Sequence, residues 1–322
     1  CRTHDAISAT LAAMEAFPSA PGVSRNALRV LAALLEDKAC RDALAHHPTG
    51  LTTVLGMQTK SDAALSKLAT EVLLKMTVFG PFRRLLLDKQ AVLSTVRAMQ
   101  ATPNHAEVQS LALHLLGKLC LDRSKAHVHS AAKQPRPTIA ACTVHAMQLL
   151  PADLSVQSVG CSLLCSVGPQ GPKTTAAAMG AAMGALDLVL ASNTSTSTCP
   201  PAQGEGISDA APEPATRNID SATARAITRD ATAFVNLALQ SGQRVDAVDA
   251  AVARHNVAGV MWRLLEHSSH ATQGSGGVGG GNKSGKNKNN GTPGAEGASQ
   301  ADASLVANCL KVVSVSAKIK FP

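Results

Sequence analysis

The sequence predicts an all-α fold built from repeated helical units, and three observations lead to this prediction. Aromatic residues make up only 2% of the 322-residue chain, and Tyr is absent, so the aromatic pairs that support β-sandwiches and barrels are scarce. Ala and Leu, which favour helices, are abundant. A short phrase recurs along the chain, and apolar residues follow it at helical spacing. The length suits about two domains or one elongated array of repeats.

The recurring phrase is Thr-Val-x-(Gly/Ala)-Met-Gln. It occupies residues 53–58, 95–100 and 143–148, at spacings of 42 and 48 residues. The last two copies stay in register through a Pro and a Val-Gln-Ser triplet, which end at residues 110 and 158. Repeats of this length are typical of stacked helical units that bury a shared core. The repeated apolar residues are therefore predicted to be buried: Val54, Val96, Val144, Met57, Met99 and Met147.

A second helix is expected in the same frame. Its apolar positions fall at i, i+4 and i+8, which places them on one face of an α-helix. The aligned positions are Ala27, Leu68, Leu111 and Val159; Leu31, Val72, Leu115 and Leu163; and Leu35, Met76, Leu119 and Val167. Pro or Gly separates the apolar segments, and Pro starts or stops helices. We therefore expect helices of about 10 to 15 residues joined by short turns.

The chain is predicted to hold three helical regions and two linkers. Residues 1–191 contain the main repeats, 220–267 a further repeat, and 301–322 the start of a truncated repeat. Residues 192–219 and the Gly/Asn/Lys-rich residues 268–300 have the composition of disordered linkers. The chain begins without Met and ends within a helical pattern, so we expect it to be a piece of a longer protein. Its terminal helices are expected to expose apolar edges.

The repeats resemble armadillo repeats. The matching segments are residues 50–58, 108–119 and 259–265, in which a Gly and an apolar residue open one helix and a long apolar helix accompanies it. The pattern Met-Gln-x-x-Pro-x-x-x-x-Val-Gln looks most like the armadillo regions of leucine-rich-repeat kinases and related eukaryotic scaffolds, and HEAT repeats are the close relatives. The resemblance covers about residues 20–191 and 220–267. It implies a right-handed superhelical solenoid whose concave face binds other proteins.

The resemblance also directs attention to three repeated amides, Gln58, Gln100 and Gln148. They occupy the position of a Trp and Asn ladder in the nuclear-import receptors of this superfamily. Because Trp262 is the only Trp, import-signal binding of that kind is not expected. The amides could line the concave face and bind an extended backbone, or they could end their helices within the solenoid. Both alternatives stay open, and the three residues are candidate partner contacts.

Most of the net charge of +8 lies in one region. Residues 60–136 hold twelve basic and five acidic residues. Because no three basic residues are contiguous, the favoured interpretation is an ordinary solvated surface spread over several helices. The alternatives are a surface for an acidic segment of a partner protein, or for nucleic acid or a phosphorylated ligand. Arg83 and Arg84, in a predicted turn between helices, and Arg97 are the favoured contacts. A stacking surface for single-stranded nucleic acid is disfavoured by the lack of aromatic residues.

No catalytic residue, cofactor or metal site is expected. Phosphate-binding loops, nucleophile elbows and kinase signatures are absent from the sequence. The densest His cluster, at His127 and His129, lacks the ligand spacing of zinc sites. Eight Cys without a Cys-x-x-Cys motif favour an intracellular, cytoplasmic location, with Cys161 and Cys165 as small buried residues. No apolar run reaches about 18 residues, so no transmembrane segment is expected. Regulation of an enzyme outside this sequence is a further alternative.

Overall fold

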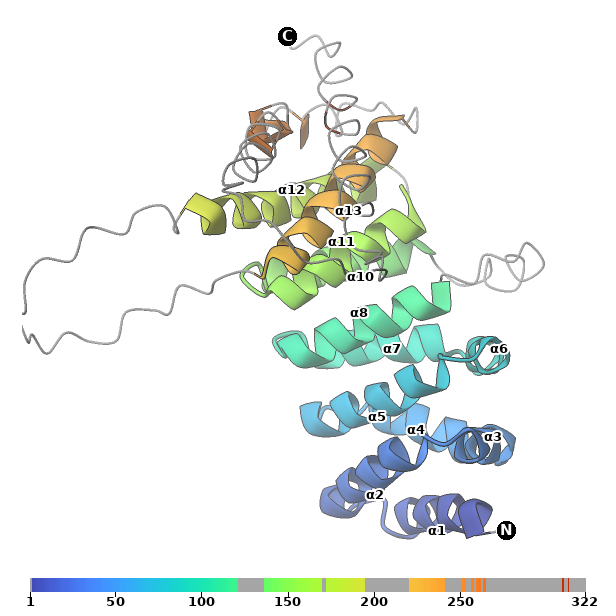
Figure 1. Cartoon of the computed structure of the whole chain (residues 1–322). Coiled ribbons are helices and arrows are strands. Elements are labelled where there is room, and N and C mark those ends of the chain that lie inside the picture. The colour runs from blue at the N-terminus through green and yellow to red at the C-terminus, as the bar shows by residue number, and fades with distance from the viewer. Residues whose placement is uncertain are drawn as a thin grey trace, which may run out of the picture. The chain divides into compact units, whose positions relative to one another are not determined.

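The computed structural model consists of helices joined by turns (Figure 1). It describes residues 2–120, 136–169, 172–194 and 220–240, and single or paired residues at 251–252, 256–257, 259–261, 263–264, 309 and 312. Every regular element within these residues is a helix, which confirms the predicted all-α class. The chain forms two compact units, Cys1–Thr174 and Thr175–Pro322.

The first unit contains the helices that run from blue to green in Figure 1. They are α1 (Arg2–Ala16), α2 (Pro21–Leu34), α3 (Lys38–His46), α4 (Gly50–Gln58), α5 (Ala63–Met76), α6 (Gly80–Asp88), α7 (Ala91–Ala101), α8 (Ala106–Cys120), α10 (Arg136–Leu149) and α11 (Leu154–Val167).

These helices stack in two rows. The longer helices α2, α5, α8 and α11 pack against one another in that order, and we call them the long-helix row. Helices α1, α4, α7 and α10 also pack in succession, and we call them the companion row. Each companion helix forms a hairpin with the long helix that follows it. The short helices α3 and α6, of nine residues each, precede the hairpins α4–α5 and α7–α8. The architecture is therefore all-helical and repeat-like.

The core lies between the two rows and contains most of the residues that the repeat predicts, while Leu68, Leu111, Val159 and Val167 of the predicted stripe are half-buried. Leu31, Val72, Leu115 and Leu163, at one aligned position of the long helices, are each 0% exposed. In the companion row the predicted core residues are also buried: Val54, Val96, Val144, Met57, Met99 and Met147. Burying a side chain of this size is worth roughly 1.5–3 kcal/mol, so the repeated positions carry much of the stability.

Local signals set the helix boundaries. Asp37, Asp62 and Asp153 precede α3, α5 and α11, and each carboxylate accepts a hydrogen bond from a backbone N–H in the first turn. This arrangement satisfies donors that have no partner inside the helix. Pro21 and Pro81 lie in the first turns of α2 and α6, where the missing N–H has no cost. The predicted role of Pro as a helix boundary is confirmed at these positions.

The N-terminal end differs from the predicted apolar edge. Helix α1 buries Ile7, Leu11 and Met14, each no more than 1% exposed, where it packs against α2, α3 and α4. Its opposite face exposes polar and small residues such as Ser8 and Glu15. Phe17 and Val30 are exposed nearby. Helix α1 thus gives this end a largely polar outer surface, because its apolar residues lie on a single face.

The second unit contains most of α12 (Pro172–Thr194) and α13 (Ser221–Gln240). Met183 and Leu186 of α12 and Phe234 of α13 are each no more than 1% exposed. Helix α12 extends to Thr194, and the rest of both predicted linkers lies outside the described residues. One stretch, Pro172–Ser192, is long and apolar enough to cross a membrane by length and composition, and 50% of its most apolar window is buried inside the structure. The core helix of a globular domain passes the same test, so the absence of a transmembrane segment stays a prediction.

Candidate protein-interaction surface

Gln58, the first candidate contact, lies inside the protein at the end of α4. Its side chain is 0% exposed. Nε2 donates hydrogen bonds to Thr70 Oγ1 of α5 and to Thr95 Oγ1 of α7, both at 3.2 Å. Gln58 therefore adopts the second alternative that the sequence left open, an amide bonded within the stack. In the folded chain it is not available to a partner.

Arg83 and Arg84 lie within α6, and the prediction that they form a turn between helices is wrong. Helix α6 begins at Gly80, and Pro81 in its first turn is compatible with helix initiation. Phe82 and Leu86, at i and i+4, are buried, so α6 has an apolar face that packs against α7 and α8. Arg84 is exposed and Arg83 is half-buried.

Four exposed polar residues on α7 and α10 form the clearest candidate surface. Arg97 and Gln100 lie three residues apart on α7, and His145 and Gln148 occupy the same register on α10. Residues at this spacing share a helix face. Because α7 and α10 pack against each other, the two pairs lie on neighbouring helices. We call these four residues the α7–α10 face. Within the part of the chain that the structure describes, none of them makes a hydrogen bond or an ion pair.

The helices of this face and their neighbour α4 carry no acidic residue. Exposed cations on these helices or at their ends include Arg97 on α7 and Lys60 just beyond α4. Helices α4, α7 and α10 therefore have no carboxylate of their own to neutralise Arg97.

The long-helix row differs, because two of its cations, Lys67 and Lys75, are paired with carboxylates of neighbouring helices. Lys67 Nζ of α5 lies 2.7 Å from Glu107 Oε2 of α8. The hydrogen bond and the opposite charge lower the pKa of Glu107 and raise the pKa of Lys67. Lys75 of α5 pairs with Glu36, at the C-terminal end of α2, whose pKa is lowered in the same way. All these groups are at least partly exposed, so the pairs neutralise charge and add little stability.

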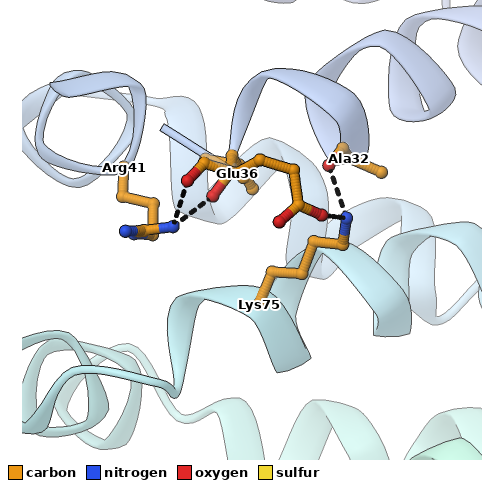
Figure 2. Close-up of polar contacts among 5 residues, drawn as sticks. Ala32, Glu36, Arg41 and Lys75 are labelled. Carbon is orange, nitrogen blue, oxygen red and sulfur yellow. Dashed lines mark hydrogen bonds and ion pairs between the residues drawn. The ribbon is translucent and has the colours of Figure 1, made fainter. Parts of the chain in front are cut away.

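Figure 2 shows how Lys75 and Arg41 surround the C-terminus of α2. Lys75 Nζ also donates to Ala32 O at 2.8 Å, and Arg41 Nη1 donates to Leu35 O and to Glu36 O. The last carbonyls of a helix have no partner within it and carry partial negative charge, which both cations satisfy. Arg41 also lies over the ring of Phe79, 4.6 Å from its centroid. This cluster is explained by helix capping and does not need a ligand.

The basic region 60–136 is thus not one surface. Lys67 and Lys75 are engaged with carboxylates on neighbouring helices. Arg123, Lys125 and Lys133 lie outside the described residues, as do His127 and His129. The exposed cations that the structure does describe are spread over several helices: Lys60, Arg84, Lys89, Arg97 and Lys118.

Sequence reasoning missed the role of Gln109 and Gln157. Each is 2% exposed. Gln109 Nε2 donates to Met99 O and to Thr102 O, both at 2.9 Å, and so closes the turn between α7 and α8. Gln157 repeats this contact with Met147 O at 2.8 Å and Leu150 O at 3.1 Å, in the turn between α10 and α11.

The repeated Pro explains why these amides are needed. In a continuing helix, Met99 O and Met147 O would accept the N–H of the residue four positions later. Those residues are Pro103 and Pro151, which have no N–H. Gln109 and Gln157 supply the missing donor. The sequence contained a signal for this role, because Pro and Gln occur together in the last two copies and are both missing from the first. The first copy has Ser61 at the position of the Pro, and Ser66 aligns with the Gln in the frame of the second helix.

Metal and thiol chemistry find no support in the described ranges. Among those residues, no group of three or more His, Cys, Asp or Glu is placed to hold a metal ion. Cys161 is buried and Cys165 is half-buried on α11. Burial raises the pKa of Cys142 on α10, which disfavours its reactive thiolate form.

No protein-family model matches this chain, and no curated protein matches its sequence. A solved structure is similar in fold: the crystal structure of an engineered protein, Northeast Structural Genomics Consortium target OR329. The two superpose with a TM-score of 0.52 at 14% sequence identity, and the match covers 97% of this chain and 98% of that chain. At this identity the similarity concerns the fold alone.

Proposed function

We propose that this chain is a non-catalytic protein-interaction scaffold of the armadillo type, and that it binds a protein partner through the α7–α10 face. A stack of repeats presents an extended surface because each unit buries its apolar side against its neighbours and leaves its polar side exposed. The observation that carries the proposal is the pair of exposed, repeated amides, Gln100 and Gln148, on packed helices.

The helix arrangement supports the armadillo type over the HEAT type. Armadillo repeats have three helices and HEAT repeats have two. The segments α3–α4–α5 and α6–α7–α8 each contain a short first helix of nine residues, a second helix, and a long third helix of 14 or 15 residues. Two such units in succession fit a solenoid of armadillo repeats.

Packing accounts for the other residues of the repeated phrase. Thr95 and Thr143 are buried and donate to the carbonyls of Ala91 and Ile139. The Val and Met residues belong to the core. Gln100 and Gln148 are exposed and make no internal hydrogen bond among the described residues. An exposed amide offers two donors and an acceptor, which suits an extended backbone of a partner.

A peptide-display selection against the full chain tests this proposal. Selected peptides should bind the double variant Gln100→Ala, Gln148→Ala roughly 5- to 100-fold more weakly, as expected for the loss of two hydrogen bonds. The matched control is Asn26→Ala, which removes an exposed amide from α2 in the long-helix row. The affinity of this control variant for the selected peptides should be unchanged.

Two results would contradict the proposal. One is that no peptide is enriched over a selection against an unrelated helical protein. The other is that every selected peptide binds the double variant and the Asn26→Ala variant equally well. Circular dichroism should show the same helix content for all the variants, because each substitution lies on an exposed helix face.

A further inference from the structure

The unneutralised charge of the companion row indicates what kind of partner fits it. On the long-helix row, Lys67 and Lys75 are each satisfied by a carboxylate of an adjacent helix, while Arg29 of α2 and Lys118 of α8 are exposed. On the companion row, α4, α7 and α10 offer no carboxylate at all. Arg97 is exposed there and has no acidic partner among the described residues. A surface that keeps a positive charge unpaired is complementary to a negatively charged ligand.

We propose that the α7–α10 face binds an acidic segment of a partner polypeptide in an extended conformation. Arg97 receives a carboxylate of that segment, because a guanidinium can donate two parallel hydrogen bonds to a carboxylate. Gln100 and Gln148 bind its backbone amides. This inference rests on the proposed function and adds the chemical class of the partner.

A polypeptide fits this face better than a nucleic acid does. Helices α4, α7 and α10 carry no Phe, Tyr or Trp on which bases could stack. Arg97, Lys60 and Lys89 are the Arg and Lys side chains described as exposed on these helices or at their ends. Nucleic-acid binding draws its affinity from many phosphate contacts, which three cations do not supply.

A fluorescence-anisotropy measurement with the full chain tests the inference. The probe is a labelled peptide of alternating Glu and Gly, compared with its Gln and Gly counterpart and with oligo-dT. The Glu peptide should bind more tightly than the other two. Arg97→Gln should weaken its binding by roughly 10- to 100-fold, the usual loss for a hydrogen bond to a charged group. The matched control, Lys118→Gln, removes the same charge from an exposed site on α8 and should change binding less than about twofold.

The outcomes separate this inference from the proposed function. Equal losses of affinity for the Glu peptide in Arg97→Gln and Lys118→Gln would show that binding depends only on net charge, and would overturn the inference. Tighter binding of oligo-dT, with a steep decrease from about 50 to 200 mM salt, would replace it with nucleic-acid binding. If display peptides depend on Gln100 and Gln148 but are not acidic, the inference fails and the proposed function stands. If no peptide binds, both fail.

Discussion

Two pairs of glutamines in the repeated units have opposite environments. Gln109 and Gln157 are buried and donate to turn carbonyls that a Pro leaves without a donor. Gln100 and Gln148 lie nine residues earlier in each copy, and they are exposed without an internal partner. The first pair is required by the fold, whereas packing does not require the second pair. The comparison therefore separates the part of the repeat that builds the stack from the part that is free to bind.

The largest expected effect comes from removing the buried amides. Gln109→Ala or Gln157→Ala leaves one carbonyl, Met99 O or Met147 O, without its donor, whereas Thr102 O and Leu150 O keep the N–H of His105 and Asp153. Each variant should lose about 1–3 kcal/mol of unfolding free energy. Gln100→Ala and Gln148→Ala, the exposed counterparts, should change it by less than about 0.5 kcal/mol. Urea denaturation followed by circular dichroism measures both. Equal losses for buried and exposed sites would remove the distinction between the two pairs.

The next effect tests the dependence of Gln109 on Pro103. Replacing Pro103 by Ala restores a backbone N–H, and extension of α7 beyond its present end at Ala101 brings this N–H to Met99 O, four residues earlier. In the Gln109→Ala background, Pro103→Ala should therefore recover about 1 kcal/mol. In the parent protein the same change should do less, because Met99 O already has a donor. A double-mutant cycle measures the coupling, and additive effects would show that Gln109 does not replace the missing N–H.

A smaller effect is expected in the α4–α5 hairpin, which lacks the paired Pro and Gln. Gly56 of α4 aligns with Ala98 and Ala146, and a Cβ at Gly56 would meet no atom within 4 Å. Gly56→Ala should stabilise the protein by about 0.5–1 kcal/mol, because Ala has the higher helix propensity. Gly160→Ala is the contrasting variant, since its Cβ would lie 2.6 Å from Met147 Sδ. A gain in thermal stability for both variants would mean that the room available for a Cβ does not determine whether a Gly→Ala change stabilises the protein.

Most of the fold was predictable from spacing alone. The Val and Met of each phrase and the aligned Leu31, Val72, Leu115 and Leu163 are buried as the helical period requires. The Asp that precedes a helix and the Pro at its first turn mark boundaries through local chemistry that acts within a few residues. Such features depend on residues that are close together in the chain, so they can be predicted from the sequence.

The candidate site was less predictable, because exposure depends on how one helix packs on another. Gln58 has the same local sequence as Gln100 and Gln148, yet it is buried against Thr70 and Thr95. Its contacts come from residues 12 and 37 positions away. Arg83 and Arg84 were assigned to a turn because Gly80 and Pro81 precede them, although the same dipeptide also starts a helix. Tertiary packing decides both cases.

The smallest effect concerns pH and the long-helix row. His114 lies on α8, where partial desolvation, reinforced by the positive charge of Lys118, lowers its pKa from the ordinary value of 6.5. The unfolded chain therefore binds a proton more readily than the folded chain does. As the pH falls through 6.5, this difference reduces the stability of the folded state, and above that pH the effect disappears. The melting temperature of the parent protein relative to His114→Gln should accordingly rise between about pH 5 and pH 8. Lys118→Gln removes the like charge, so the rise should be smaller in that background, and a rise of unchanged size would exclude Lys118 as a cause.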